Sequence, residues 1–500
     1  MRPAKEATSE PQRYLFKVEL ADDDRVIGWV IDQHAVGRPP WIQVSIDGMT
    51  FATFIAADAV DSRALDLEHC TAELAARFQT QPQIPAGFCY QIPTSIPRGA
   101  KHRVEVTVVD NRQKTLIFQT ESTFAENAIA GIRSLFSEFR FFSLDEVEWQ
   151  GGNNIECRAW CSVPEKIDHG LMLSVNGEPV QTTMEQLPGP PDPQQFTFWP
   201  ERPTYALTAK IDLAKIQMNP RGYQLAGVDA GGQRYFPQSQ DFYIPPYWKE
   251  CLGSWPLPRL SAIERVTPWV AQRADQEASP LVKTGFLLTG YTDIWHIDDV
   301  LSQVIQRSIR DMGAILDWGC GCGRLAQHLV RLESCDVHGA DIDPENVAWA
   351  NENIPGASFA AIGLDPPLPY SDGQFDLVIG ISVFTHLTEA DQFAWLSELR
   401  RVLKPGGTLA VTVAGHNALK KATLPAALRF YRETSESGFS DRAIGNTFDH
   451  LLKHRPAYYR NTRHLAHYIR REWARYFEIK AVVPAAMAGQ QDLVVGTKLK

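Results

Sequence analysis

One short stretch limits the folds available to this chain more than any other: ILDWGCGCGR at residues 315–324. An apolar run ends in Asp317, and three glycines follow at alternate positions, Gly319, Gly321 and Gly323. A buried strand that leads into a glycine-rich loop is typical of an open parallel sheet, where ligands bind beyond the carboxyl ends of the strands. Glycines lack the Cβ atom that would keep a ligand away from the backbone. The stretch therefore predicts a ligand-binding loop.

The spacing of the glycines indicates which ligand this loop holds. Dinucleotide folds use G-x-G-x-x-G and P-loops end in GK[ST], and this loop matches neither pattern. Asp317 places a carboxylate beside the loop, which suits a ligand that carries an ammonium group. Asp341 ends the next predicted strand, about where an acid contacts ribose hydroxyls in nucleotide-binding folds. Asp343 is an alternative, but it precedes Pro344 and is expected to cap the following helix.

The first half of the chain predicts antiparallel sheets. Short runs such as RVEVTVVD (103–110) alternate apolar and polar residues between turn signals, which is typical of β-sandwiches. Trp29 and Trp160 each precede a hairpin signal, SIDG or SVNG, so we expect two β-sandwich units, at about 12–122 and 140–243. A single larger β-domain is the alternative. In either case we expect the two tryptophans and the isolated cysteines of this half to be buried.

The second half alternates strands with helices, which predicts a doubly wound α/β domain with a parallel sheet. We interpret 244–284 as a linker and 285–500 as this domain. One helix is expected over 296–312, and Thr388 with Asp391 predicts the start of another. The expected strands are AILDW (314–318), VHGAD (337–341), FDLVIGIS (375–382), GTLAVTV (407–413) and a closing pair in YFEIKAVV and DLVVGTK.

Composition excludes several other classes of protein. The 500 residues are too many for one core, and the net charge of −10 argues against a nucleic-acid partner. No apolar run is long enough for a membrane helix, and the first residues, MRPAKEATSEPQRY, do not resemble a secretory signal. The cysteines form no CxxC pair, so we expect no metal site and a reducing, cytoplasmic location.

Several motifs occur in order along the second half. They are D-x-G-x-G-x-G, the acid after the second strand, LPYSDGQFDLVI and LRRVLKPGGTLAVTV. Together they resemble the class I S-adenosylmethionine (SAM)-dependent methyltransferases over about 285–500. SVFTHL (382–387), YYR (458–460) and QDLVV (491–495) resemble a bacterial subgroup of that family. The resemblance implies a seven-stranded Rossmann-like domain with SAM as its cofactor.

The resemblance also implies roles for single residues. It places the three glycines around the methionine part of the cofactor, Asp341 on the ribose and Ile342 on the adenine. Many members carry an acid after the third strand, whereas this chain has Gly363 and Leu364 there, so we expect a backbone contact, with Asp365 as a substitute. Arg324 either reaches the cofactor's carboxylate or is solvated. The expected cofactor residues are Asp317, Gly319, Gly321, Gly323, Asp341, Ile342, Leu364 and Ser382.

A general base speeds methyl transfer to a hydroxyl by taking its proton. His386, which follows the fourth strand in SVFTHL, is the first candidate, and the alternative is that it only fixes the loop by hydrogen bonds. His416 is a weaker candidate. The residues expected to line the acceptor pocket are Tyr291, Asp293, Tyr459, Arg460 and His464.

The first β-unit resembles β-sandwich segments found beside glycosyltransferases and methyltransferases in bacterial surface-polysaccharide systems. The matching motifs are GWVID (28–32), VSIDG (44–48), AGF (86–88) and HRVEV (102–106). The chain is therefore predicted to methylate a sugar or polysaccharide hydroxyl. A methyltransferase for a small secondary metabolite is one alternative, and a non-catalytic protein that binds a glycan or a partner is another.

Overall fold

The computed structural model divides the chain into two compact units, residues 1–126 and 127–500. The described residues are 13–21, 25–33, 39–56, 58–61, 83–92, 96, 101–110, 113–123, 139–167, 170–189, 202–253, 280–332, 335–421, 430, 433–434, 437–443 and 458–499.

The first unit contains two four-stranded antiparallel sheets, ordered β1-β2-β6-β5 and β4-β3-β7-β8. Buried residues of both sheets, such as Val30 and Val44, form one hydrophobic cluster. The SIDG hairpin is confirmed, since Asp47 and Gly48 have positive φ angles of 51° and 79° between β3 and β4. The strands are Tyr14–Ala21, Arg25–Asp32, Trp41–Ile46, Met49–Ile55, Asp58–Asp61, Gln83–Gln91, Lys101–Asp110 and Gln113–Thr123, for β1 to β8.

The second unit begins with two further four-stranded antiparallel sheets, ordered β13-β14-β10-β9 and β12-β11-β15-β16. Cys157 and Cys161 are fully buried among their apolar side chains, as expected of small hydrophobic residues. Trp160 is buried here and Trp29 in the first unit, so the core positions predicted for both are confirmed. The strands are Phe141–Gly151, Asn154–Ser162, Leu171–Val175, Glu178–Val180, Thr182–Leu187, Thr204–Asp212, Tyr223–Asp229 and Phe242–Ile244, for β9 to β16.

Among the described residues, helices α3 (Trp248–Gly253) and α6 (Pro280–Val304) follow these strands, so α3 lies in the segment that we interpreted as a linker and α6 begins inside it. The helix predicted over 296–312 was wrong at both ends. It starts earlier, and it ends at Val304 because Gln306 takes a left-handed backbone with a φ of 57°. Ile309 lies in a separate 3₁₀ turn, η5 (Ile309–Asp311), which Ser308 caps.

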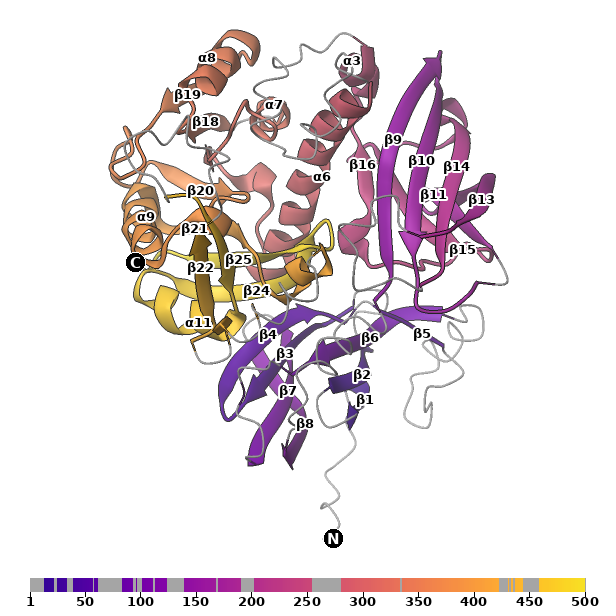
Figure 1. The fold of residues 1–500 in the computed structure, drawn as a ribbon, viewed down its shortest axis with the longest axis horizontal. Coiled ribbons are helices and arrows are strands. Elements are labelled where there is room, and N and C mark those ends of the chain that lie inside the picture. The colour runs from indigo at the N-terminus through magenta and orange to yellow at the C-terminus, as the bar shows by residue number, and fades with distance from the viewer. Residues whose placement is uncertain are drawn as a thin grey trace. The chain divides into compact units, whose positions relative to one another are not determined.

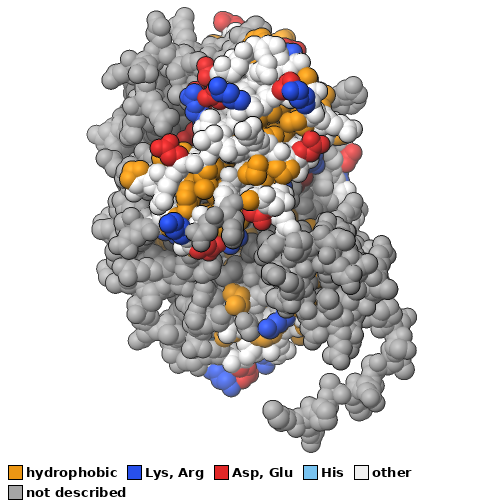
Figure 2. Space-filling model, turned by 90° about the vertical axis from the view of Figure 1, so that its right-hand side faces the viewer, with side chains coloured by type: hydrophobic (Ala, Val, Ile, Leu, Met, Phe, Trp, Pro, Cys, Tyr) orange, Lys and Arg blue, Asp and Glu red, His pale blue; other side chains and the backbone are white. Residues whose placement is uncertain are grey.

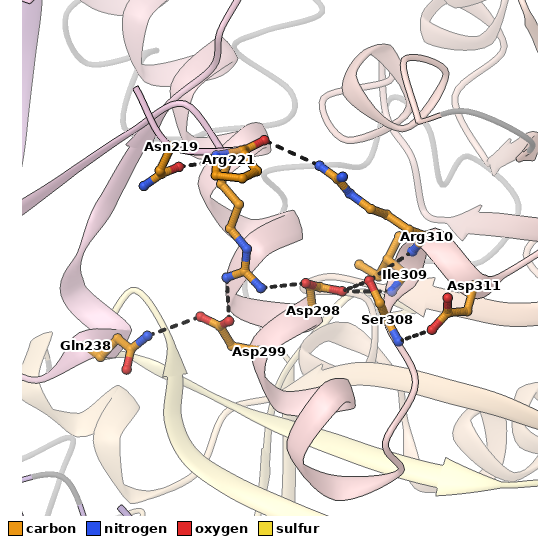
Figure 3. Close-up of polar contacts among 10 residues, drawn as sticks. Asn219, Arg221, Gln238, Asp298, Asp299, Ser308, Ile309, Arg310 and Asp311 are labelled. Carbon is orange, nitrogen blue, oxygen red and sulfur yellow. Dashed lines mark hydrogen bonds and ion pairs between the residues drawn. The ribbon is translucent and has the colours of Figure 1, made fainter. Parts of the chain in front are cut away.

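Helix α6 runs between the second set of β-sheets and the seven-stranded sheet (Figure 1). Its Leu288 belongs to the hydrophobic core of the β-sheets. Arg221, in the turn before β15, forms ion pairs with Asp298 and Asp299 on the helix (Figure 3). Asp298 also accepts hydrogen bonds from the Ser308 hydroxyl (2.6 Å) and from the Ile309 amide (2.8 Å). The second β-region is therefore joined to the α/β domain by apolar and ionic contacts.

The α/β domain contains a seven-stranded sheet, ordered β19-β18-β17-β20-β21-β25-β24. The first five strands in this order are parallel, while β25 is antiparallel to both β21 and β24. The strand order reverses at β17, so the loop after it lies at the switch point where ligands bind in such sheets. The predicted Rossmann-like sheet and its closing strand pair are confirmed. The strands are β17 Ala314–Trp318, β18 Asp336–Asp341, β19 Ala357–Ala361, β20 Phe375–Gly380, β21 Leu403–Val413, β24 Glu478–Met487 and β25 Gln491–Thr497.

The helices that begin at Pro344 and Glu389 have the caps that the sequence predicts. The Asp343 carboxylate accepts from the Glu345 amide (3.0 Å), and the Thr388 hydroxyl accepts from the Asp391 amide (3.1 Å). A two-stranded hairpin of β22 and β23 adds a separate small sheet. The elements are α7 Ala326–Leu329, α8 Pro344–Asn353, η6 Phe384–His386, α9 Glu389–Val402, η7 His416–Lys421, β22 Phe439–Ala443, β23 Arg460–His464, α11 Ala466–Glu472 and η8 Trp473–Arg475.

The surface of the described residues mixes charges of both signs. On the face in Figure 2, basic and acidic side chains lie near one another with apolar groups between them. On the sheet that contains β10, for example, Arg158 is within 2.8 Å of both Glu146 and Glu156. None of the helices in the described part of the chain is long and apolar enough to cross a membrane.

Candidate functional site

The glycine loop follows β17 and is built on left-handed backbone. Gly319, Gly321 and Gly323 have φ angles of 75°, 54° and 80°, which residues with a side chain rarely adopt. A Cβ atom on Gly319 would lie 2.3 Å from the Val383 side chain, and one on Gly323 would lie 2.3 Å from Ile354. These two glycines are therefore required by the packing of the loop itself, in addition to any ligand that approaches it.

Asp317 lies under this loop at the end of β17. Its side chain is only 2 % exposed, and its Oδ2 atom has no hydrogen-bond partner among the described residues. Burial raises the pKa of this carboxyl to about 7, although the positive charge of Arg324 opposes the shift. A buried carboxylate oxygen without a donor is unfavourable, and an ammonium group placed beside it would remove that cost.

Asp341 ties the second strand to the loop. One carboxylate oxygen accepts from the Gly321 amide at 2.7 Å, and the other accepts from the Asp343 amide at 2.8 Å. Asp343 itself caps α8, as expected from its position before Pro344. Burial raises the pKa of Asp341, and the amide hydrogen bonds act against that shift. The amides of Gly321, Asp343 and Ile342 act on its carboxylate, which has roughly four acceptor sites and so keeps capacity for a ligand hydroxyl.

Three more residues predicted to contact the cofactor lie in loops after neighbouring strands. Ile342 directly follows Asp341 and is partly exposed. The Leu364 carbonyl accepts a hydrogen bond from the Tyr458 hydroxyl at 2.9 Å, and this bond holds the backbone of the loop after β19 in place. Ser382 follows β20 with a φ of 60°, a left-handed conformation that costs energy in a residue with a side chain.

His386 ends the short helix η6, which follows β20. Its Nδ1 atom donates to the Arg460 carbonyl at 2.9 Å, and its ring stacks on Tyr459 with 4.1 Å between centroids. This hydrogen bond assigns the proton to Nδ1 and leaves Nε2 as a lone-pair acceptor. Burial lowers the pKa of His386 to about 4, so the ring is neutral at physiological pH. The residue fixes the hairpin and still presents a basic nitrogen.

The β22–β23 hairpin lies beside η6 and the end of β21. The Thr462 hydroxyl donates to the Leu387 carbonyl at 2.6 Å, and the His464 amide donates to the Ala414 carbonyl at 3.1 Å. Burial raises the pKa of Tyr459, and the negative charge of Asp341 adds to that shift. Tyr459 therefore lies within electrostatic reach of the predicted ribose acid while it stacks on the candidate base. The structure brings together one group of predicted residues here: Asp341, His386, Tyr459 and Arg460.

Other predicted residues lie elsewhere. The Tyr291 hydroxyl donates to the Arg221 carbonyl at 2.9 Å, so this side chain faces the second β-region. His464 is fully buried, with its Nε2 atom 2.9 Å from the Gln392 amide oxygen and its ring against Trp473. Both side chains serve as core residues.

Two further predicted residues lie outside this group. Asp293 pairs with Arg324 at 2.6 Å, so that pair links α6 to the residue after the glycine loop. His416, the weaker candidate base, has a buried Nε2 atom without a hydrogen-bond partner among the described residues, and burial lowers its pKa to about 4.

Sequence reasoning missed Gly290 and Arg463. A Cβ atom on Gly290 would lie 2.1 Å from the Arg324 carbonyl oxygen, so α6 packs directly on the end of the glycine loop. Nothing in the sequence of α6 signals that contact. Arg463 belongs to the same strand as Arg460 and is only partly exposed. An arginine in a polar strand is expected to be solvated, which is why the sequence did not single it out.

Residues 315–407 match the family model described as a methyltransferase domain. The chain is also similar to curated methyltransferases. It is 36 % identical over 99 residues to a 2-methyl-6-phytyl-1,4-hydroquinone methyltransferase of Synechocystis. The aligned stretch covers 19 % of this chain and 30 % of that protein. It is 30 % identical over 135 residues to a ubiquinone biosynthesis O-methyltransferase of Cereibacter sphaeroides. That alignment covers 24 % of this chain and 52 % of the relative. The chain thus spans about half or less of these relatives.

Solved structures of methyltransferases are similar to part of this chain. One is a TehB-like SAM-dependent methyltransferase of Corynebacterium glutamicum, at 22 % identity and a TM-score of 0.22, over 37 % of this chain and 80 % of that one. Another comes from Methanosarcina mazei, at 20 % identity and a TM-score of 0.27, over 37 % and 92 %.

Proposed function

We propose that this chain is a SAM-dependent methyltransferase. The observation that carries the proposal is the pair of acids around the glycine loop. Asp317 offers a buried oxygen without a donor, and Asp341 is held against the Gly321 amide with acceptor capacity to spare. The match of residues 315–407 to the methyltransferase domain agrees with this geometry. The residues fit the cofactor, because SAM carries an ammonium group for the first acid and ribose hydroxyls for the second.

Each predicted cofactor residue then has a task. Asp317 binds the ammonium group, and Asp341 accepts hydrogen bonds from the ribose. The three glycines allow close approach to the loop, while Ile342, Leu364 and Ser382 border the adenine. When bound, the cofactor supplies an electrophilic methyl group on a positively charged sulfur. The protein's contribution is to hold the acceptor in line with that group and to exclude water.

His386 is the proposed general base. Its Nδ1 proton is held by the Arg460 carbonyl, so Nε2 accepts the proton that an acceptor hydroxyl loses. A pKa of about 4 makes the ring a weak base, but it also keeps the ring unprotonated throughout the physiological range. Tyr459 and Arg460 lie against it and are proposed to border the acceptor. Asp293 belongs instead to the support of the loop through its pair with Arg324.

Calorimetry with SAM tests the proposal against the alternative of a non-catalytic binding protein. We expect micromolar binding by the full chain and at least a tenfold loss in the Asp341→Asn variant. Incubation with methyl-labelled SAM and fractionated cell extract should then label one class of molecule. Absence of SAM binding in a folded sample would favour the binding protein, and binding without labelling of any fraction would point to lost catalysis.

For the acceptor we propose a sugar or polysaccharide hydroxyl. The support is the resemblance of the first unit to β-sandwich segments in surface-polysaccharide systems, together with two sheets that share one core in each β-region. We propose that both regions, 12–122 and 140–243, are β-sandwiches. The similar O-methyltransferase of Cereibacter is named for ubiquinone biosynthesis, so a small-molecule acceptor is the second candidate.

A further inference from the structure

Gln491, the first residue of β25, lies at the edge of the sheet that carries the proposed site. β25 runs antiparallel to β21, and Asp492 at its start pairs with Val413 at the end of β21. The first residues of β25 therefore lie beside the carboxyl ends of the parallel strands, where ligands bind in such sheets (Figure 1). The match to the methyltransferase domain ends at residue 407. The QDLVV motif thus adds a side chain to the site from outside the matched segment.

The side chain of Gln491 contacts Ser382, which follows β20. Its amide nitrogen donates to the Ser382 hydroxyl at 2.8 Å, and its amide oxygen lies 3.2 Å from the same hydroxyl. Because β21 lies between β20 and β25 in the sheet, this contact joins the ends of two strands that are not neighbours. Asp492 has a different task, since its carboxylate accepts from the Ala485 amide of β24 at 2.9 Å. Only the glutamine of the motif therefore contacts the loop after β20.

Ser382 has a backbone conformation that costs energy. Its φ of 60° lies in the left-handed region, which a residue with a side chain keeps only when its surroundings hold it there. Its amide donates to the buried Thr412 hydroxyl at 2.7 Å, and its carbonyl accepts from the Thr385 hydroxyl at 2.7 Å. The Gln491 amide binds its side chain. Three polar partners therefore fix the amide, the carbonyl and the side chain of one strained residue.

The conformation of Ser382 determines the course of the turn that carries His386. The His386 amide donates to the Val383 carbonyl at 2.9 Å, so a single turn of chain separates Ser382 from the proposed base. Val383 also packs on the glycine loop, where a Cβ atom on Gly319 would lie 2.3 Å from its side chain. A change at Ser382 would therefore move His386 relative to that loop. A misplacement of about 1 Å can cost on the order of 100-fold in the rate of a reaction.

We propose that Gln491 is a positioning residue for methyl transfer: its amide holds Ser382 in the left-handed conformation and thereby keeps His386 in place to accept the proton of the acceptor hydroxyl. The inference rests on the proposed function, since it takes His386 as the general base. Gln491 acts through Ser382 and touches neither the cofactor nor the acceptor in this role. Loss of one hydrogen bond of this kind shifts an equilibrium about fivefold.

Labelled-methyl transfer by variants of the full chain tests the pair. Gln491→Leu, which removes the amide at similar volume, should lower the rate about fivefold with SAM affinity unchanged in calorimetry. Ser382→Ala removes only the hydroxyl, and the double variant should be no slower than the slower single variant, because both changes remove the same contact. In a Ser382→Gly background, where left-handed backbone carries no strain, Gln491→Leu should cause little further loss. The matched control is Gln374→Leu, at the other end of β20, where the glutamine accepts from the Ser371 amide at 3.1 Å. It should transfer methyl groups like the wild type.

A spectroscopic measurement tests the positioning without any acceptor. In protein labelled with carbon-13 at histidine Cε1, the signal of His386 is the one that is missing from His386→Gln. Burial lowers the pKa of His386 to about 4, so between about pH 7.5 and pH 5.5 this signal should stay fixed in the wild type and in Gln374→Leu. In Gln491→Leu the signal should move or broaden and begin to titrate in this range, because the ring leaves its buried position part of the time.

Two outcomes would overturn the positioning role. One is a His386 signal in Gln491→Leu that matches the wild type at every pH, whether or not transfer is slower. The other is a double variant whose loss of rate equals the product of the two single losses, since Gln491 and Ser382 would then act independently. If the wild type binds SAM but labels no fraction, the histidine signal still decides the role of Gln491. Failure of the proposed reaction and failure of the positioning role are therefore read separately.

Discussion

The buried carboxyl of Asp317 makes the affinity for SAM depend on pH. Its pKa is raised to about 7 by burial, so in the free protein it is about half protonated at pH 7. The ammonium group of SAM favours the ionised form, and binding therefore has to expel the proton. The perturbation is a change of pH, and its effect has a definite sign. Affinity should fall as the pH decreases below 7.

The size of the effect follows from the protonated fraction. In the complex with SAM we expect the Asp317 carboxyl to titrate well below pH 5. The apparent dissociation constant is then proportional to 1 + 10^(pKa − pH), where the pKa is that of Asp317 in the free protein. Affinity should then fall about fivefold from pH 7 to pH 6, which is about 1.0 kcal/mol, and about ninefold more by pH 5, which is about 1.3 kcal/mol. Above pH 7 the comparison ends, because amino groups of this type lose their own proton near pH 7.7 to 8.0.

Isothermal titration calorimetry in buffers of different ionisation enthalpy measures both consequences. At pH 6 about 0.9 proton should leave per SAM bound, and at pH 7 about 0.5. Asp317→Asn cannot release this proton, so its affinity should be weaker at pH 7 and flat below it. Asp341→Asn should also weaken binding, and because the charge of Asp341 helps to raise the pKa of Asp317, this variant should show the fall in affinity at lower pH. An affinity that stays constant between pH 5 and pH 7 in the wild type would refute this role of Asp317.

Four further predictions concern the support of the site. His386→Ala should reduce turnover at least tenfold, measured by labelled-methyl transfer, with SAM affinity unchanged. In the wild type, kcat should decline on the acid side near pH 4 rather than near pH 6.5. Gly290→Ala should weaken SAM binding and lower the melting temperature, because its Cβ atom would clash with the backbone after the loop; normal binding would show that α6 yields. Arg221→Ala should lower the free energy of unfolding in denaturant by roughly 2 to 3 kcal/mol, since it leaves the buried Asp298 carboxylate without its arginine partner. Burial lowers the pKa of His464 to about 3, whereas the unfolded chain has a value near 6.5. The free energy of unfolding should therefore fall as the pH decreases from 6.5 toward 3, by at most about 5 kcal/mol. In His464→Gln this loss should be smaller.

The backbone of the glycine loop and the cap of the helix after Asp343 were predictable because their signals are local. The alternate glycines follow a strand of five residues, and the left-handed backbone they permit is a property of the loop itself. Asp341 was separable from Asp343 because a residue before proline at a helix start has a structural use. These inferences depend on neighbours within a few positions, so no knowledge of the tertiary structure was needed.

The acceptor side was less predictable because tertiary contacts decide it. In YYRNTRH the histidine looks like a ligand-binding residue and the second arginine like a solvated one. The structure contradicts the expectation for the histidine, since Gln392 and Trp473 enclose His464. The prediction that Tyr291 lines the acceptor pocket failed for the same reason. The sequence of a helix reveals its apolar face but does not tell which neighbouring sheet or loop that face contacts. Here the partner is Arg221 of the second β-region.

The methyltransferase match does not cover the whole candidate site. It ends at residue 407, so it includes the glycine loop, Asp341 and His386 but excludes strands β22 and β23. The molecules that the relatives methylate therefore carry little information about the part of the site that these two strands would form.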